Sequence, residues 1–359
     1  MKIYQRYLAI EVSAAILLVL AAFLVLFSFF DLVGELRDVG KGDYQLRFAV
    51  AFILLRLPGR LYELMPIAVL IGALYALSTL ARHSELTVLR ASGLSTGRLL
   101  LTLFQIAAVF GAITLVTGEF IAPPADKMAK QMRLSAFGQL VSQEFRTGLW
   151  MKDDMTFVNV RAVTPDGQLR SIRIYEFDKQ ARLASVSEAT EGVYQEPASW
   201  RLKDVVRTEL NDTATKGSVS TMPEVVWKSA LSPDILGVLL VRPESMAISH
   251  LTAYLKHLRD NKQKTQRYEI ALWKKAIYPL AALVMIALAL PFGYTHNRVA
   301  GVSLKIFAGV MIGILFHLLN GLFSNLGAIN SWPPLPSAAA PSLIFMIAAA
   351  GMLLWVERR

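Results

Sequence analysis

Four cations beside two apolar stretches are the residues best suited to hold an acidic ligand. Arg37 and Lys41 follow the first stretch, and Lys130 and Arg133 follow the third, one helical turn apart. Guanidinium and ammonium groups bind phosphate through charge-assisted hydrogen bonds, so these residues could hold a phosphorylated amphiphile. A solvated juxtamembrane surface explains the same cations equally well, and the acids among residues 31–43 favour that interpretation.

A second candidate is the short polar segment 81–93, which joins two apolar stretches. Ser84 could cap a helix, Glu85 suits the positive end of its dipole, and Gly93 can adopt the left-handed conformation that ends it. Leucines within the segment form an apolar stripe. We interpret it either as an interfacial connector or as a docking helix for a cytoplasmic partner.

No catalytic motif accompanies these residues. The glycines of residues 93–98 lack the spacing and the lysine of a phosphate-binding loop, and the five histidines are scattered. The chain has no cysteine, which excludes disulfides, thiolate metal sites and a cysteine nucleophile. We therefore predict a protein that is not an enzyme, with no catalytic residue, cofactor or metal, and expect a partner to supply any energy it needs.

Six stretches are long and apolar enough to cross a bilayer, which takes about 20 residues. Charged residues make up 18% of the chain, against about 25% in soluble domains. In lipid a helix satisfies its own backbone groups, so each stretch is predicted to be helical. The stretches are residues 8–30, 61–80, 99–120, 277–294, 302–326 and 338–356.

Basic residues in short loops set the expected orientation. They lie before the first stretch, between the second and third, between the fourth and fifth (His296 and Arg298), and at the carboxyl end. Both termini are therefore predicted to be cytoplasmic, with a large insert on the other side of the membrane. The basic segment Lys256–Lys275 falls on that outer side, and the sequence supplies no positive reason for it. The net charge of +10 fits anchoring at anionic lipid better than nucleic-acid binding.

The insert alternates in polarity, as a half-buried strand does. Thr156–Val163, Ser171–Phe177 and Trp200–Val206 are predicted strands, and turn residues separate the first two, which favours a sandwich or barrel. Ser245–Arg267 then changes to helical periodicity, which predicts one amphipathic helix.

The predicted parts are residues 1–134 with three spans and the short helix 84–93, residues 135–245 with an all-β domain, and residues 246–359 with the amphipathic helix and three spans.

Several motifs then point to a known family. They are Met65–Leu74, Leu80–Leu86, Arg90–Gly93, Glu119–Pro123, Gly148–Asp153 and Leu231–Asp234. In this order they resemble the permease family of the lipopolysaccharide exporter over nearly the whole chain. Of the two paralogous permeases, the G-type is the better match, notably through Gly148–Asp153 and Ser249–Tyr254.

The resemblance implies a multi-pass protein of the bacterial inner membrane with six transmembrane helices and a periplasmic β-jellyroll. It implies an F-type permease partner, two copies of a cytoplasmic ATPase and a single-span bridging subunit that also carries a jellyroll. Lipopolysaccharide would enter a cavity between the permeases from the outer leaflet and pass along the jellyrolls toward the outer membrane. The ATPase would receive the short helix through residues that include the family acid, here Glu85. This coupling set is Arg82, Ser84, Glu85, Leu86, Leu89, Arg90 and Gly93.

The family's cavity cations correspond to Arg37, Lys41, Lys130 and Arg133. Asp31 and Asp38 stand where related sequences carry lysine, which weakens this part of the expected phosphate site.

Three alternatives stay open: the F-type paralogue, an ion-coupled secondary lipid transporter, and a mechanical subunit that carries no substrate itself. An ion-coupled transporter needs ionisable residues near the bilayer midplane, whereas Glu11, Glu63, Glu119 and Lys305 lie near the ends of the predicted spans. The strand order of the β domain, its partner-pairing edge and the lateral gate are not predicted.

Overall fold

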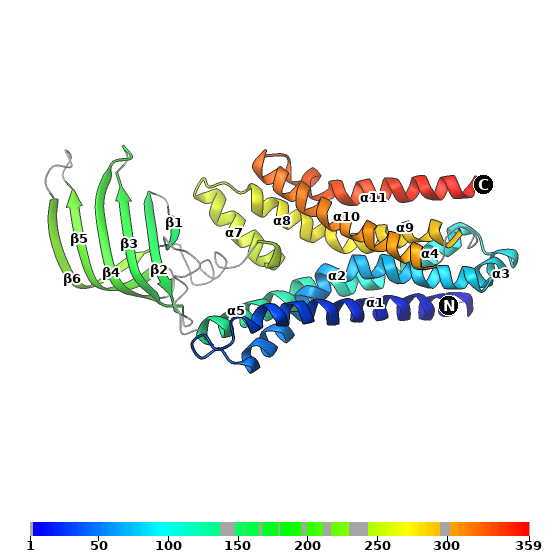
Figure 1. The fold of residues 1–359 in the computed structure, drawn as a ribbon. Helices are drawn as coiled ribbons and strands as arrows, with labels where there is room; N and C mark the ends of the chain where they lie inside the picture. The colour runs from blue at the N-terminus through cyan, green and yellow to red at the C-terminus, as the bar shows by residue number, and fades with distance from the viewer. Residues whose placement is uncertain are drawn as a thin grey trace.

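The computed structural model describes residues 3–136, 148–153, 155–164, 167–178, 180–195, 199–210, 217–229, 243–294 and 302–358. A bundle of long helices forms one part of the molecule and an antiparallel β sheet the other (Figure 1). Both chain termini lie at the end of the bundle farthest from the sheet, which we call the terminal end. The opposite end, beside the sheet, is the sheet end. His296, Arg298 and the motif Leu231–Asp234 lie outside the described residues.

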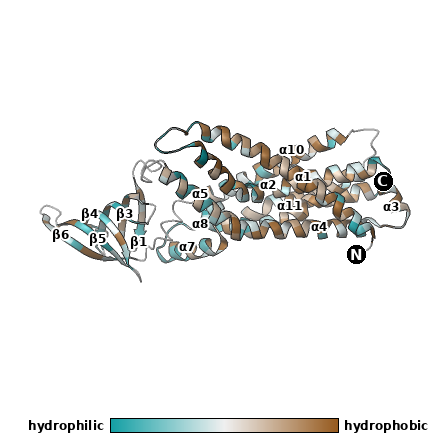
Figure 2. Cartoon of the chain, turned by 90° about the horizontal axis from the view of Figure 1, so that it is seen from below, coloured by the Kyte–Doolittle hydropathy of each residue, from teal (hydrophilic) through white to brown (hydrophobic). Residues whose placement is uncertain are grey.

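Six helical segments are long and apolar enough to cross a membrane, so this prediction is confirmed. They are α1 (Ile3–Leu36), α2 (Leu46–Arg82), α4 (Thr96–Val116) with its continuation α5 (Ala122–Ala136), α8 (Gln266–Ile277) with its continuation α9 (Ala281–Tyr294), α10 (Val302–Ile329) and α11 (Pro334–Glu357). Apolar residues cover the bundle between its two ends (Figure 2). Several helices extend past the apolar stretches at the sheet end, where they carry charged residues.

Helix α2 is the centre of the bundle, and neighbouring helices bury most of its apolar membrane-spanning part. Gly72 permits the closest approach, because a Cβ there would lie 2.5 Å from the Cα of Ile16 on α1. Small residues let transmembrane backbones pack at such short range. By contrast, α1, α10 and α11 leave many large apolar side chains uncovered, which leaves these faces for lipid or another subunit.

The insert forms a six-stranded sheet in which every pairing is antiparallel and consecutive strands are neighbours. The strands are β1 (Leu149–Asp153), β2 (Thr156–Val163), β3 (Leu169–Phe177), β4 (Leu183–Gln195), β5 (Ser199–Leu210) and β6 (Gly217–Lys228). Val158, Ile172 and Ile174 lie buried on one face with the fully buried Trp200, as the alternation predicts. The all-β prediction is confirmed, and the strand order, which the sequence left open, is an up-and-down meander.

The single helix predicted over Ser245–Arg267 is wrong in its middle. The structure has α7 (Ile248–Asp260), a break, and then α8. The apolar stripe through Leu251 and Leu258 would continue at position 262, where Lys262 offers nothing to bury and adopts a φ of 53°. The chain therefore turns back, and α7 packs on α8 through the rings of Tyr254 and Tyr268, whose centroids are 4.8 Å apart.

Candidate functional site

The predicted short helix is present as α3 (Glu85–Ala91) at the terminal end of the bundle (Figure 1). Leu86 is buried in the bundle core, and its Cδ2 would lie 3.6 Å from a Cβ at Gly293 of α9. Leu89 is half-buried, while Arg82 and Arg90 are exposed. The helix is thus fixed to the bundle through one face and presents charged side chains on another.

The ends of α3 match the prediction in part. Gly93 has a φ of 94°, so it supplies the left-handed conformation expected after the helix. The predicted side-chain cap at Ser84 is wrong, because Ser84 itself is left-handed, with a φ of 63°, and its hydroxyl caps nothing. Its carbonyl instead accepts from the Val88 N–H at 3.0 Å. A serine side-chain cap occurs one helix later, where Ser95 accepts from the backbone N–H of α4.

Glu85 has a partner that the sequence did not reveal. The hydroxyl of Tyr7, near the start of α1, donates to Glu85 Oε2 at 2.5 Å. The two residues are 78 positions apart, so no local pattern could indicate the contact. The carboxylate expected to contact a partner protein is therefore also a link between α3 and α1.

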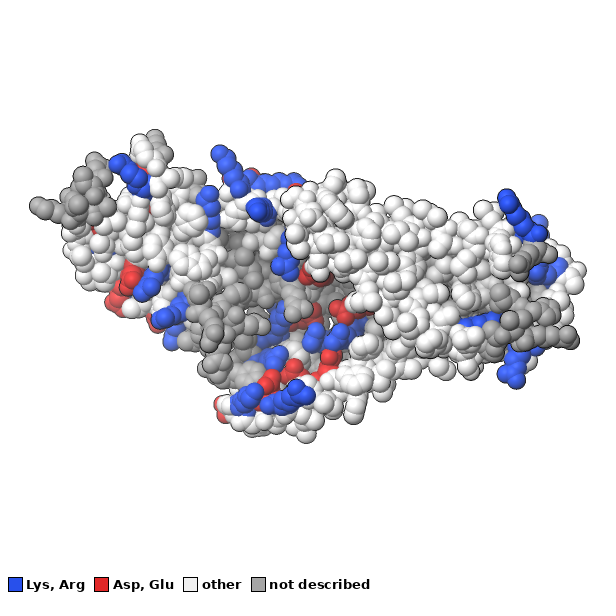
Figure 3. Space-filling model, turned by 45° about the horizontal axis from the view of Figure 1, so that its top comes forward, with Lys and Arg blue, Asp and Glu red and all other residues white. Residues whose placement is uncertain are grey.

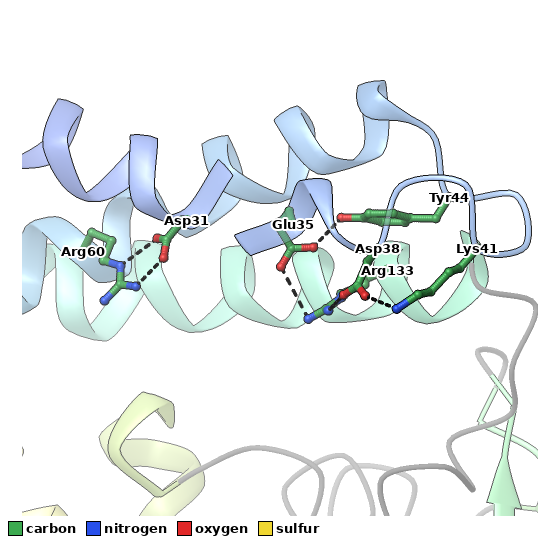
Figure 4. A network of polar contacts seen from close by, with 7 residues as sticks. All are labelled: Asp31, Glu35, Asp38, Lys41, Tyr44, Arg60 and Arg133. Carbon is green, nitrogen blue, oxygen red and sulfur yellow. Dashed lines mark hydrogen bonds and ion pairs between the residues drawn. The ribbon is translucent and has the colours of Figure 1, made fainter. Parts of the chain in front are cut away.

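The four predicted cations lie at the opposite, sheet end of the bundle, and we call Arg37, Lys41, Lys130 and Arg133 the cation rim. Two of them are paired with acids of the α1 end (Figure 4). Arg133 on α5 lies 2.8 Å from Asp38 and 3.6 Å from Glu35, and Lys41 lies 2.7 Å from Asp38. The hydrogen bond from Lys41, followed by that from Arg133, lowers the pKa of Asp38.

The other two rim cations differ in their surroundings. Lys130 lies one turn before Arg133 and one turn after Asp126 on α5, and it interacts electrostatically with that acid. The side chain of Arg37 is exposed and makes no ion pair or hydrogen bond with the described residues. The structure therefore brings Lys41, Lys130 and Arg133 to the α1–α5 corner and leaves Arg37 open to solvent.

Sequence reasoning missed two residues of this corner. Arg60 of α2 holds Asp31 through two hydrogen bonds, of 2.8 and 3.0 Å, so the charge of Asp31 is neutralised within the protein. Tyr44 is buried, and its hydroxyl donates to Glu35 at 2.8 Å. Burial, reinforced by this bond to the carboxylate, raises the pKa of the Tyr44 hydroxyl. Neither residue belongs to a motif; each acts through tertiary contacts.

A third polar cluster joins the third span to the segment that follows the sheet. A π-helical turn, Thr117–Ile121, directs Glu119 toward the start of α7, where both carboxylate oxygens lie 2.9 Å from the Ile248 N–H. Buried Lys275 of α8 lies 3.6 Å from Glu119 and donates to the carbonyl of Met246. This ion pair gives a structural role to Lys275, one of the cations of the basic segment Lys256–Lys275 that the sequence left unexplained.

Charges gather at both ends of the bundle and are sparse over its middle (Figure 3). At the sheet end, side chains of both signs lie close together beside the sheet. Within the described ranges, no group of three or more His, Asp or Glu side chains is arranged to hold a metal ion. The arrangement suits electrostatic binding and mechanical linkage.

Comparison with known proteins agrees with these elements. The profile of the lipopolysaccharide export system permease LptF/LptG family matches residues 6–355. The lipopolysaccharide export system permease protein LptG of Haemophilus influenzae is 32% identical over 358 residues, which cover 99% of this chain and 98% of the relative. The protein of the same name from Escherichia coli strain K12 is 31% identical over 355 residues, with 98% of each chain covered.

Proposed function

The chain belongs to the lipopolysaccharide export system permease LptF/LptG family, and on that premise we propose that it is the G-type permease subunit of an ATP-driven lipopolysaccharide exporter. In this role it extracts lipopolysaccharide from the outer leaflet of the inner membrane and passes it along its β domain toward the outer membrane. The observation that carries the proposal is one continuous family match that includes both α3 and the cation rim.

The six apolar helices and the family are consistent with a multi-pass inner-membrane protein. The proposed orientation places the terminal end in the cytoplasm and the sheet in the periplasm. Its support is the positive-inside rule, because Arg6, Arg82, Arg98 and Arg358 all belong to the terminal end. The charged sheet end is then at the periplasmic boundary, where a phosphorylated headgroup would lie.

Energy enters from a separate cytoplasmic ATPase that binds α3. The contacting residues are the predicted coupling set, of which Arg82, Ser84 and Arg90 are exposed and Glu85 is partly exposed. Since buried Leu86 fixes α3 to α2 and α9, a shift of α3 moves the bundle with it. The F-type permease supplies the other half of the cavity, and the single-span bridging subunit continues the path.

Extraction in one step is energetically excluded. Each buried methylene contributes about 0.8 kcal/mol, and a lipid with several acyl chains exceeds what a single hydrolysis event can offset. The proposed cavity therefore offers the acyl chains an apolar surface while they leave the membrane, which offsets part of the free energy that they lose. The uncovered apolar side chains of α1 and α10 provide such a surface, and the cation rim holds the phosphates.

The decisive experiment replaces Glu85 with alanine in the complete complex. We expect ATP hydrolysis to continue while ATP-dependent release of lipopolysaccharide from membrane vesicles is lost. Tyr7→Phe is the matched control, because it removes the internal hydrogen bond and keeps the carboxylate. Release that survives in both variants would refute the docking role.

Equal loss of release in both variants would assign Glu85 to the internal link instead. Release that persists without ATP but stops when the proton gradient collapses would favour the ion-coupled transporter. Mass spectrometry of proteins and lipids copurified in detergent tests the partners and the cargo together.

A further inference from the structure

An open cavity of about 450 Å³ lies between α8 and α10 at the sheet end, away from the rim. Helix α8 contributes two cations to its wall, Arg267 and Lys274, with apolar Ile270 between them. Helix α10 contributes the exposed amide of Asn325 and the small side chain of Ala328. Cations, an amide and apolar groups thus face the same space.

The two cations lie on one face of α8, because seven residues make two helical turns. Neither side chain makes an ion pair or hydrogen bond with the residues that the structure describes. Glu244, which also lines the cavity, and Glu63 attract Lys274 electrostatically without reaching ion-pair distance. Two cations facing one lining acid leave an excess of positive charge on this wall.

The α1–α5 corner is more nearly neutral than the α8 wall of this cavity. Asp38 pairs with Lys41 and Arg133, and Arg60 is held by Asp31. A phosphate that binds Lys41 or Arg133 must displace a carboxylate, whereas Arg267 and Lys274 are held in no ion pair with a described residue. Charge-assisted hydrogen bonds to phosphate are strongest where the cation has no other partner.

We infer that Arg267 and Lys274 form a phosphate site on the α8–α10 wall that takes a phosphorylated headgroup of the lipid cargo. This inference rests on the proposed function for the identity of the cargo. Asn325 is placed to donate to a headgroup oxygen, and Ile270 and Ala328 contact the apolar part of the same lipid.

The test uses the purified complete complex with a photoreactive amino acid at Ala328. The probes are lipid A carrying two phosphates, lipid A with both phosphates removed, and vesicles of phosphatidylglycerol. Arg267→Gln and Lys274→Gln are the test variants. Lys264→Gln is the matched control, because this lysine is exposed just before α8 and does not line the cavity.

We expect each test variant to lower crosslinking of phosphorylated lipid A about tenfold, which corresponds to ~1.4 kcal/mol. The control variant should crosslink like the unmodified complex, and dephosphorylated lipid A should crosslink weakly to both. Unchanged crosslinking in both test variants, or equal crosslinking of the two forms of lipid A, would overturn the inference. Preferential crosslinking of phosphatidylglycerol would overturn it too and assign the wall to membrane phospholipid.

Failure of the proposed function would look different. Lipid release that does not depend on ATP contradicts the exporter, yet phosphate-dependent crosslinking at Ala328 would still support the site.

Discussion

Arg133 Nη2 lies 2.8 Å from Asp38 Oδ2, although the two residues are 95 positions apart in the chain. The contact fastens the end of α1 to α5 and occupies a cation that the family resemblance assigns to phosphate. The acid and an incoming phosphate therefore compete for one guanidinium.

Asp38→Asn should raise the affinity of the complex for phosphorylated lipid A. Removing the carboxylate frees Arg133 and Lys41, and a charged hydrogen bond of this kind contributes roughly 1.5–3 kcal/mol before exposure weakens it. A several-fold decrease in the dissociation constant, measured by lipid titration, is the expected result. Asp43→Asn is the matched control, because Asp43 is exposed and its side chain pairs with no described residue. Weaker binding by Asp38→Asn would show that the acid helps to shape the site.

The same acid predicts a pH dependence. The pKa of Asp38 is lowered in the folded protein, so its pairing stabilises the fold above the unfolded pKa of about 3.9. That stabilisation is lost as the pH falls through the lower folded pKa. Thermal unfolding of the unmodified protein and of Asp38→Asn should therefore differ at neutral pH and converge in strong acid. A difference that grows on acidification would contradict this assignment.

Glu119→Gln should destabilise the junction between the third span and α7. The side chain of Lys275 is 6% exposed, and its carboxylate partner is 16% exposed, so the substitution leaves an uncompensated buried charge. Breaking one side of such a pair costs about 3–5 kcal/mol. We expect a lower melting temperature and faster proteolysis at the start of α7.

The double variant Glu119→Gln/Lys275→Met is the control for this prediction. It removes the stranded charge, so much of the lost melting temperature should return. No recovery would show that the hydrogen bond to Ile248, and not the charge pair, is the main contribution.

Gly72→Ala should separate α1 from α2. The new methyl group would lie 2.5 Å from the Cα and 2.7 Å from the backbone nitrogen of Ile16, and these atoms cannot rotate away as a side chain could. We expect reduced yield and a lower melting temperature. Gly351→Ala is the matched control, because nothing lies within 4 Å of a Cβ there and alanine favours a helix interior. Equal stability of the two variants would refute close packing at Gly72.

The sequence alone predicted those features that depend on one local physical requirement. Apolar length predicted all six spans, and alternation predicted which face of the β2 and β3 strands is buried. It was insufficient where distant residues meet. At the sheet end, charged residues such as Asp31 and Arg60 lie within long helices and pair with one another between α1 and α2, a contact that no local pattern indicates. Ser84 illustrates a limit of local rules, since a suitable capping residue adopted a conformation that cannot cap.

Helix α2 has a mechanical consequence of its own. Its 37 residues form one rod, about 55 Å long at 1.5 Å per residue, that begins beside the rim and ends at the segment leading to α3. No loop lies between the two ends to absorb a displacement. Pro58 and Pro66 each remove a backbone hydrogen bond from the rod, so the rod bends most easily at these two prolines. Arg60 lies between the two prolines, so a stroke applied at the far end would flex the rod close to the residue that holds Asp31 of α1.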